Sequence, residues 1–324
     1  MGIIKGSSIF LFLVSFIWHA AVAGSIRDPL VDQTAAQKSS VSLEDSESSE
    51  GVGTLPQGVK VLRDIPYGNS GKQRMDVYLP RDARKQAPVI FMVHGGGWRT
   101  GDKALRAVVE NKMARWVPRG FIFVSVNYRL LPEADPLQQA EDVARALATA
   151  QAQAASWGGD SSKFILMGHS AGAHLVALLG ADPSKAIALG AKPWLGAVLL
   201  DSAALDVVQI MEAAHARLYD RAFGAQPTYW RSASPFHRLT ASATPMLAVC
   251  STRREDSCRQ ARNFAARASS LGVQIKVLEQ DMSHLEINET LGKPGAYTGA
   301  VEAFMGSLDT AVMKALTTPP AGTR

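Results

Sequence analysis

The segment LMGHSAGAHL, residues 166–175, places a serine between two glycines in the pattern Gly-x-Ser-x-Gly. An apolar segment, residues 163–167, precedes Ser170, and an Ala- and Leu-rich segment, residues 171–179, follows it. In a strand–turn–helix corner of this kind, small neighbours let the backbone turn sharply, so that the serine Oγ is exposed above the sheet. We therefore expect Ser170 to be a nucleophile; the alternative is an ordinary turn between a strand and a helix.

A second glycine motif, His94-Gly-Gly-Gly-Trp98, follows the apolar segment 88–93. Consecutive glycines let backbone N–H groups turn toward a bound carbonyl oxygen, which a side chain would block. In such motifs the later glycines supply the donors, so we expect the N–H groups of Gly96, Gly97 and Ala171 to form an oxyanion hole. The alternative, a phosphate-binding loop, would need a following Lys-Ser/Thr pair or a Rossmann fingerprint, and the sequence has neither.

Short apolar segments that recur along the chain predict the strands that position these motifs. Two segments alternate in polarity, as edge strands do, at residues 59–62 and 74–79. Five further segments are largely apolar at successive positions, as buried parallel strands are: 88–93, 121–126, 163–167, 196–200 and 245–249. The segment 274–278 is the last predicted strand. Helical patterns lie between them, at residues 137–157, 171–179 and 257–271. This alternation predicts an α/β fold, a mostly parallel sheet covered by helices on both faces, over residues 57–318.

The motifs carry a resemblance. From about residue 60 to 315 the sequence resembles the α/β-hydrolase superfamily, and HGGGW, NYRL at 127–130 and GHSAGAHL resemble the hormone-sensitive-lipase-like carboxylesterases and the kynurenine formamidase-like hydrolases. The resemblance implies a Ser-His-Asp triad that cleaves a small-molecule carboxylic ester through an acyl-enzyme and needs no cofactor. It also implies a small cap over the site, which we expect at residues 206–237.

The triad requires a general base, which follows the acid in the chain. Three histidines come after the helix that follows Ser170. His215 lies in an Ala-rich helical region and His237 lies in a turn, Ser-Pro-Phe-His. His284 follows the last predicted strand, in a strand-end loop, and is the expected base.

For the acid we expect Asp256, which follows the segment 245–249 at the place where similar hydrolases carry the carboxylate. It would orient the imidazole and stabilise the imidazolium. The adjacent Glu255 is a rival, and Asp201 and Asp206 are more distant ones.

Two cysteines, Cys250 and Cys258, bracket the expected acid loop. In an oxidising compartment they are candidates for a disulfide that would hold Asp256 in place; two unpaired thiols are the alternative. Two arginines, at positions 253 and 254, stand where the family often has a small glycine-containing turn.

Four other residues near the motifs have weaker signals. Trp98 and Tyr128 follow strand ends and are candidates for lining the substrate pocket, with plain packing as the alternative. His169 is expected to be structural, and His174, one helical turn past Ser170, is expected to be a satisfied core histidine. No His/Cys/Asp/Glu spacing in the sequence indicates a metal site.

The N-terminus resembles a cleavable signal peptide over residues 1–23. Lys5 is followed by an apolar segment, residues 9–18, and by Ala21-Val-Ala23, a small-residue cleavage pattern. We therefore expect export to the periplasm or the medium, without stable membrane insertion; an uncleaved anchor is the alternative. Residues 24–56 are rich in Ser, Glu and Gln, which predicts a disordered linker.

Composition excludes few functions. The formal net charge is +5, but no Lys/Arg-rich run occurs, so we expect no nucleic-acid partner. The sequence indicates no oligomeric state.

Two alternatives to the esterase remain. One is an arylformamidase, favoured by GHSAGAHL with HGGGW and disfavoured by export. The other is a non-catalytic binding module, disfavoured because the serine, the histidine and the glycines are all present.

Overall fold

The computed structural model describes residues 51, 53, 55–81 and 85–319. The predicted signal peptide and most of the predicted linker lie outside these residues. The end of the predicted linker is described and contacts the rest of the chain: Gly51 forms a β-bridge with Leu105, and Leu55 packs against a cluster of buried apolar side chains. The contacts of the domain therefore begin before residue 57.

Eight strands form one sheet in the order β1-β2-β4-β3-β5-β6-β7-β8. Strands β1 and β2 are antiparallel to their neighbours, and all other pairs from β4 to β8 are parallel. The strands are β1 (Val59–Pro66), β2 (Arg74–Pro80), β3 (Ala87–Val93), β4 (Ile122–Val126), β5 (Gly159–His169), β6 (Gly196–Leu200), β7 (Met246–Ser251) and β8 (Ile275–Gln280). This sheet confirms the predicted α/β fold, and each predicted strand is present.

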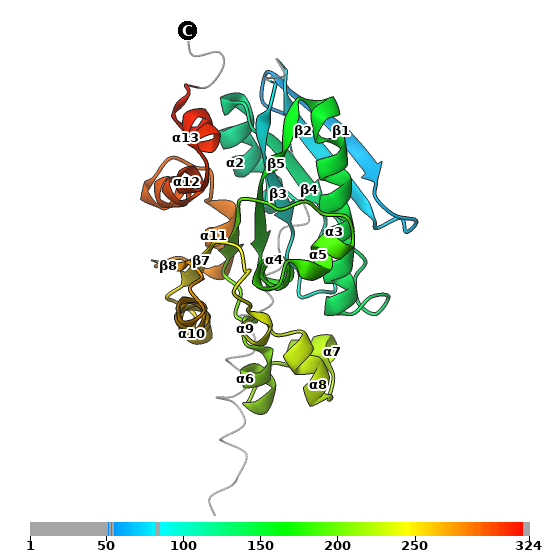
Figure 1. Ribbon diagram of the computed structural model, residues 1–324, viewed down its shortest axis with the longest axis vertical. Coiled ribbons are helices and arrows are strands. Elements are labelled where there is room, and N and C mark those ends of the chain that lie inside the picture. The colour runs from blue at the N-terminus through cyan, green and yellow to red at the C-terminus, as the bar shows by residue number, and fades with distance from the viewer. Residues whose placement is uncertain (1–50, 52, 54, 82–84, 320–324) are drawn as a thin grey trace, which may run out of the picture. The chain divides into compact units, whose positions relative to one another are not determined.

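Helices cover both faces of the sheet, as Figure 1 shows. On one side lie α3 (Pro136–Gln153), α4 (Ala171–Ala181), α5 (Ser184–Ala188) and α10 (Glu255–Ser270); on the other lie α2 (Arg106–Trp116), α11 (His284–Glu289), α12 (Ala296–Leu308) and α13 (Thr310–Thr317). Short 3-10 turns follow α2 at Val117–Arg119 and α3 at Ala154–Trp157.

Side chains that alternate along the central strands build the two apolar layers between sheet and helices. In β3, Val89 and Phe91 belong to the cluster beneath α3 and α4, whereas Ile90 and Met92 belong to the cluster beneath α2 and α12. All four are fully buried. This explains why the central strands are apolar at every position: a strand covered on both faces buries both sets of side chains.

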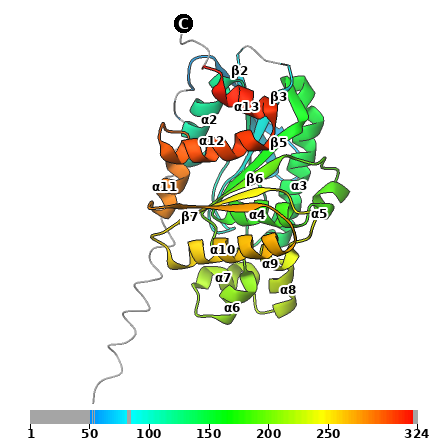
Figure 2. The ribbon, with the colours of Figure 1, turned by 60° about the vertical axis from the view of Figure 1, so that its left-hand side comes forward.

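The segment between β6 and β7 forms four short helices: α6 (Val207–Glu212), α7 (Arg217–Phe223), α8 (Pro227–Ser232) and α9 (Pro235–Arg238). Figure 2 shows α6, α7 and α8 gathered at one end of the sheet, beyond α9 and α10. This is the segment in which we expected a cap. None of the described helices is long and apolar enough to cross a membrane.

Candidate active site

Ser170 lies at the corner between β5 and α4, in a backbone conformation that is rare for a residue with a side chain. Its φ is 54° and its ψ is −118°. The neighbouring glycines are required by space: a Cβ on Gly168 would lie 2.4 Å from the Gly172 carbonyl oxygen, and a Cβ on Gly172 would lie 2.3 Å from the Val93 carbonyl oxygen. The corner therefore closes only with small residues, which is the geometry that exposes a nucleophile. Ala171 begins α4 directly behind Ser170.

The glycine loop after β3 lies against this corner. A Cβ on Gly95 would lie 3.0 Å from both the His169 carbonyl oxygen and Ser170 Cβ. Gly96 and Gly97 have φ values of 104° and 58°, conformations that favour glycine. The structure thus brings the three expected oxyanion-hole residues to the neighbourhood of Ser170, from two separate elements.

Trp98 and Tyr128 are buried and support this loop from behind. The Tyr128 ring stacks on His94 with centroids 4.5 Å apart, and its hydroxyl donates to the His94 carbonyl oxygen at 3.0 Å. The Trp98 indole N–H donates to His174 Nδ1 at 3.1 Å. Since Nδ1 accepts, His174 Nε2 carries the proton and donates to the Ala233 carbonyl oxygen at 2.7 Å. His174 is therefore a satisfied core histidine, as expected, whereas both aromatic residues serve packing.

Helix α7, in the segment where we expected a cap, also contacts the glycine loop after β3. The Trp98 ring lies 5.0 Å from Phe223 and 6.1 Å from Tyr219, centroid to centroid, and both residues belong to α7. A Cβ on Gly97 would lie 3.0 Å from Leu218 Cδ1. Helix α7 is therefore packed on the loop that carries the candidate oxyanion donors.

His284 pairs with Asp201. The imidazole Nδ1 lies 2.6 Å from Asp201 Oδ2. Asp201 directly follows β6, and His284 begins α11, four residues after β8. Because an ionised carboxylate only accepts hydrogen bonds, Nδ1 carries the proton, which leaves Nε2 free to act as a base.

Asp256 does not occupy this position, which corrects our expectation for the acid. It lies in the first turn of α10, its side chain is 61% exposed, and its carboxylate pairs with Arg259 of the same helix. The physical reason is that α10 already begins at Glu255, so both acidic residues sit at a solvated helix N-terminus, where negative charge is favourable. The more distant rival, Asp201, is the carboxylate that contacts His284.

The Asp201 carboxylate is fully buried and accepts four hydrogen bonds. Oδ1 accepts from the Ser251 backbone N–H at 2.7 Å and from the Ser257 hydroxyl. Oδ2 accepts from His284 and, at 2.6 Å, from Arg254 Nη1. Burial alone would raise the pKa of Asp201, but the His284 hydrogen bond and the Arg254 charge outweigh it and hold that pKa well below its usual range.

The pKa of His284 is lowered to about 4. Burial is the largest cause, and the neighbouring His169 and Arg254 act in the same direction, against the attraction of Asp201. The His169 ring lies 4.4 Å from the His284 ring, centroid to centroid, and its Nε2 donates to the His284 carbonyl oxygen at 3.1 Å. The imidazole of His284 is thus neutral over the ordinary pH range, as a general base must be.

Cys250 and Cys258 form a disulfide, with Cα atoms 5.0 Å apart. It closes the segment 250–258, which we call the arginine loop because it carries Arg253 and Arg254. Within this loop the Ser251 hydroxyl donates to the Met282 carbonyl oxygen at 2.6 Å, two residues before His284. The disulfide therefore closes a loop that contacts both Asp201 and the segment that leads to His284.

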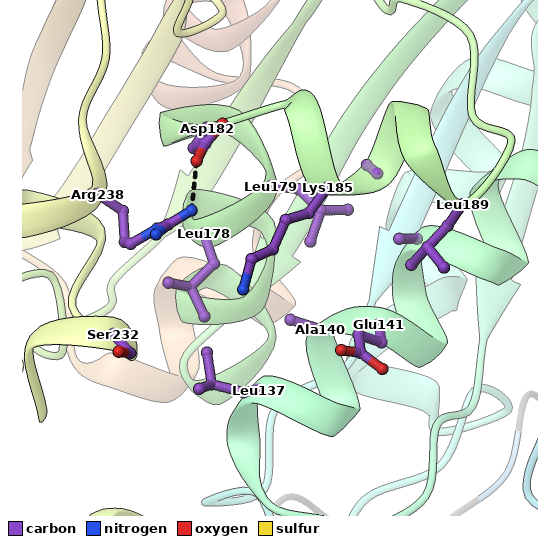
Figure 3. Close-up of a pocket in the computed structure, with 12 residues that line it drawn as sticks. Leu137, Ala140, Glu141, Leu178, Leu179, Asp182, Lys185, Leu189, Ser232 and Arg238 are labelled. Atoms are coloured by element: carbon purple, nitrogen blue, oxygen red, sulfur yellow. Dashed lines mark hydrogen bonds and ion pairs between the residues drawn. The ribbon is translucent and has the colours of Figure 1, made fainter. Parts of the chain in front are cut away.

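A hollow lies away from this constellation, between α3, α4 and α5 (Figure 3). Its lining includes Leu137, Leu178 and Leu189, and also Asp182 and Arg238, which form an ion pair. Leu178 is eight positions beyond Ser170 on α4, roughly 12 Å along the helix axis. The hollow is therefore separate from the candidate site. Among the described residues, no group of three or more His, Cys, Asp or Glu could hold a metal ion.

The BD-FAE family model matches residues 75–256, more than half of the chain. The chain belongs to this family of α/β-hydrolases. Among curated proteins it is similar to esterase LipC of Mycobacterium tuberculosis, 31% identical over 67% of this chain and 57% of the relative. It is also similar to a probable isoprenylcysteine α-carbonyl methylesterase of Oryza sativa, 36% identical over 36% of this chain and 28% of the relative. The chain thus spans less than two thirds of the length of either relative.

A solved structure, esterase B of Lactobacillus rhamnosis, superposes with a TM-score of 0.65 over 88% of this chain and 95% of that one, at 18% identity. At this identity the likeness shows the fold alone. The expected α/β-hydrolase fold is therefore confirmed for the BD-FAE family member described here.

Proposed function

We propose that the protein is a serine hydrolase that cleaves carboxylic esters. The observation that carries the proposal is that a strained Ser170, a neutral and partly buried His284, and an ionised Asp201 follow the carboxyl ends of β5, β8 and β6 in one sheet. This is the constellation of a catalytic triad, and the glycine loop beside Ser170 supplies the expected oxyanion donors. That several relatives are named as esterases supports an ester rather than an amide as the substrate.

The reaction proceeds in two halves. Ser170 Oγ attacks the ester carbonyl carbon while His284 Nε2 takes the hydroxyl proton, and the N–H groups of Gly96, Gly97 and Ala171 bind the oxyanion. His284 then gives the proton to the leaving alcohol, and the acyl group stays on Ser170. In the second half, water attacks the acyl-enzyme carbonyl and loses a proton to His284, which returns that proton to Ser170 Oγ as the bond to the acyl group breaks and the carboxylic acid leaves. Asp201 holds the imidazole in the tautomer that both halves need.

We further propose that the protein is exported. The sequence of residues 1–23 supports this, and so does the disulfide, because disulfides persist in oxidising compartments. Expression of the full chain in a bacterial host, followed by fractionation and N-terminal sequencing, tests the proposal. Mature protein beginning at Gly24 outside the cytoplasm is expected, and an uncleaved chain in the cytoplasm would contradict export.

The test of the activity is hydrolysis of p-nitrophenyl esters from acetate to decanoate by residues 24–324 and by the Ser170→Ala variant. We expect turnover by the native protein and a loss of several orders of magnitude in the variant. Absence of turnover at every chain length, with turnover of an aryl formamide by the same folded protein, would replace the esterase by the arylformamidase.

A further inference from the structure

We propose that Arg254 is a positioning residue of this site and that its fixed positive charge, held against His284, sets the acid limit of the reaction. The inference rests on the proposed serine hydrolase activity and adds a residue that the triad does not require. Arg254 belongs to the arginine loop, in place of the small turn expected there.

The guanidinium of Arg254 contacts both members of the acid–base pair. Nη1 lies 2.6 Å from Asp201 Oδ2, 3.1 Å from the Asp201 carbonyl oxygen and 2.9 Å from His284 Nδ1. The side chain is 17% exposed, so water screens these contacts only in part. Asp201 Oδ2 thus accepts from two donors at once, one from the base and one from a permanent cation.

This arrangement has opposite effects on the two partners. The charge of Arg254 favours the ionised form of Asp201, so the acceptor for Nδ1–H persists in acid. A proton on Nε2 of His284, however, would place a second positive charge about 3 Å from the guanidinium, which is unfavourable at such range. The imidazole therefore stays neutral, and able to accept the Ser170 proton, to lower pH than it would beside Asp201 alone.

Other charged groups around His284 do not duplicate this role. Among the described residues, the titratable and charged groups that face the pair are His169 at the end of β5, Tyr219 of α7, Arg254 before α10, Tyr297 of α12 and, on the helix of His284, Glu286. Glu286 is turned to solvent, where its carboxylate pairs with Arg253. Among these groups Arg254 alone carries a permanent positive charge.

The two adjacent arginines are held differently, which makes the role specific to Arg254. Arg253 is half exposed, and its Nε donates to Asp281 at 2.8 Å. Arg254 directly precedes α10, and its backbone N–H donates to the Ser251 carbonyl oxygen at 3.3 Å, closing a tight turn inside the disulfide-bounded loop. The turn directs its side chain inward to Asp201, while that of Arg253 lies on the surface.

The test is the pH profile of kcat/KM for p-nitrophenyl acetate, because its acid limb reports the pKa of the base in the free enzyme. It is read at the wavelength where p-nitrophenol and its anion absorb equally. Arg254→Gln keeps a donor near Asp201 and removes the charge, whereas Arg254→Lys keeps the charge. Arg259→Met is the matched control, because it removes one positive charge from an exposed ion pair on α10, the helix that follows Arg254.

We expect the acid limb of Arg254→Gln to move up by roughly one pH unit, because loss of the cation makes protonation of His284 easier. Arg254→Lys and Arg259→Met should keep the native limit. An equal loss of activity at every pH, with no movement of the limb, would overturn the proposal, since this is what a structural role gives. Folding of the variants is checked by thermal unfolding. If neither Arg254 variant folds, the proposal is also overturned.

A second readout separates this inference from the proposed function. The Cε1–H resonance of His284, assigned by its loss in His284→Ala, is titrated by NMR in the native protein and in Arg254→Gln. If the native protein hydrolyses no ester, the activity fails, but a raised pKa of His284 in Arg254→Gln still supports the charge effect. An unchanged titration would overturn the role of Arg254 even in an active esterase.

Discussion

His284 Nδ1 lies 2.6 Å from Asp201 Oδ2, although the two residues are 83 positions apart in the chain. Asp201 directly follows β6 and His284 follows β8, so the pair reaches across the end of β7, which lies between those strands. The end of β7 and the start of α10 hold the carboxylate in place, because the Ser251 N–H and the Ser257 hydroxyl both donate to Asp201 Oδ1. The acid–base pair is therefore a product of sheet order rather than of any local motif.

We predict that the free energy of unfolding falls as the pH is lowered from about 6.5 to about 4. His174 and His284 both have folded-state pKa values of about 4, chiefly because of burial. In the unfolded chain they titrate near 6.5. Between these values the unfolded state binds more protons, so the stability is fully present above the unfolded pKa and is lost in acid.

Urea unfolding at several pH values across that window measures this effect. In His174→Gln one of the two groups no longer titrates, so the slope of stability against pH should be shallower than in the native protein. Equal slopes in the two proteins would show that His174 does not contribute.

Loss of the disulfide should lower both stability and activity. From the entropy of closing so short a loop, the Cys250→Ala/Cys258→Ala variant should lose about 2–3 kcal/mol of the free energy of unfolding. Its kcat should also fall, because the arginine loop supplies three of the four donors to Asp201. Denaturation and ester turnover are measured with and without reductant. A native protein that is unaffected by reduction, with the bond shown to be broken, would contradict this role.

Gly172→Ala should disrupt the corner at Ser170. The added methyl would lie 2.3 Å from the Val93 carbonyl oxygen, so α4 must move away from β3, at a cost of about 1–3 kcal/mol or more. Gly299→Ala on α12 is the matched control, since nothing lies within 4 Å of the added atom there. In that variant the better helix propensity of alanine should raise stability slightly. Thermal unfolding distinguishes the two, and similar midpoints would refute the packing argument.

The places of Ser170 and His284 in the fold could be predicted because each residue carries a local signal. Ser170 has flanking glycines, a strand before it and a helix after it, and His284 follows the last strand. The structure contains these features because each of them depends only on the backbone path of a single strand, turn or helix. His174 was likewise predictable as a core residue from its place on the apolar helix after Ser170.

The acid could not be decided in the same way. Chain order requires only a carboxylate between Ser170 and His284, and both Asp201 and Asp256 follow strands. The difference is that α10 starts at Glu255, which turns Asp256 to solvent. This helix start has no side-chain cap, so the sequence does not indicate where the helix begins. One signal pointed to Asp201: it directly follows the last apolar residue of β6, as Ser170 directly follows the end of β5.

Tyr128 is a second residue whose place could not be predicted from the sequence. It follows a strand end, as pocket residues do, but its ring is buried against His94. Which strand-end aromatic faces the substrate depends on the path of the neighbouring glycine loop, and that path is set by contacts between distant segments.

The proposed mechanism depends on Asp201, and not Asp256, as the partner of His284. The most direct measurement is kcat/KM for a p-nitrophenyl ester in Asp201→Asn and Asp256→Asn, with folding checked by circular dichroism. We predict a loss of about 10⁴ in Asp201→Asn, because the amide favours the wrong tautomer of the imidazole. In Asp256→Asn we predict a change within about twofold, as for an exposed surface residue. A large loss in Asp256→Asn, with near-native activity in Asp201→Asn, would contradict this mechanism.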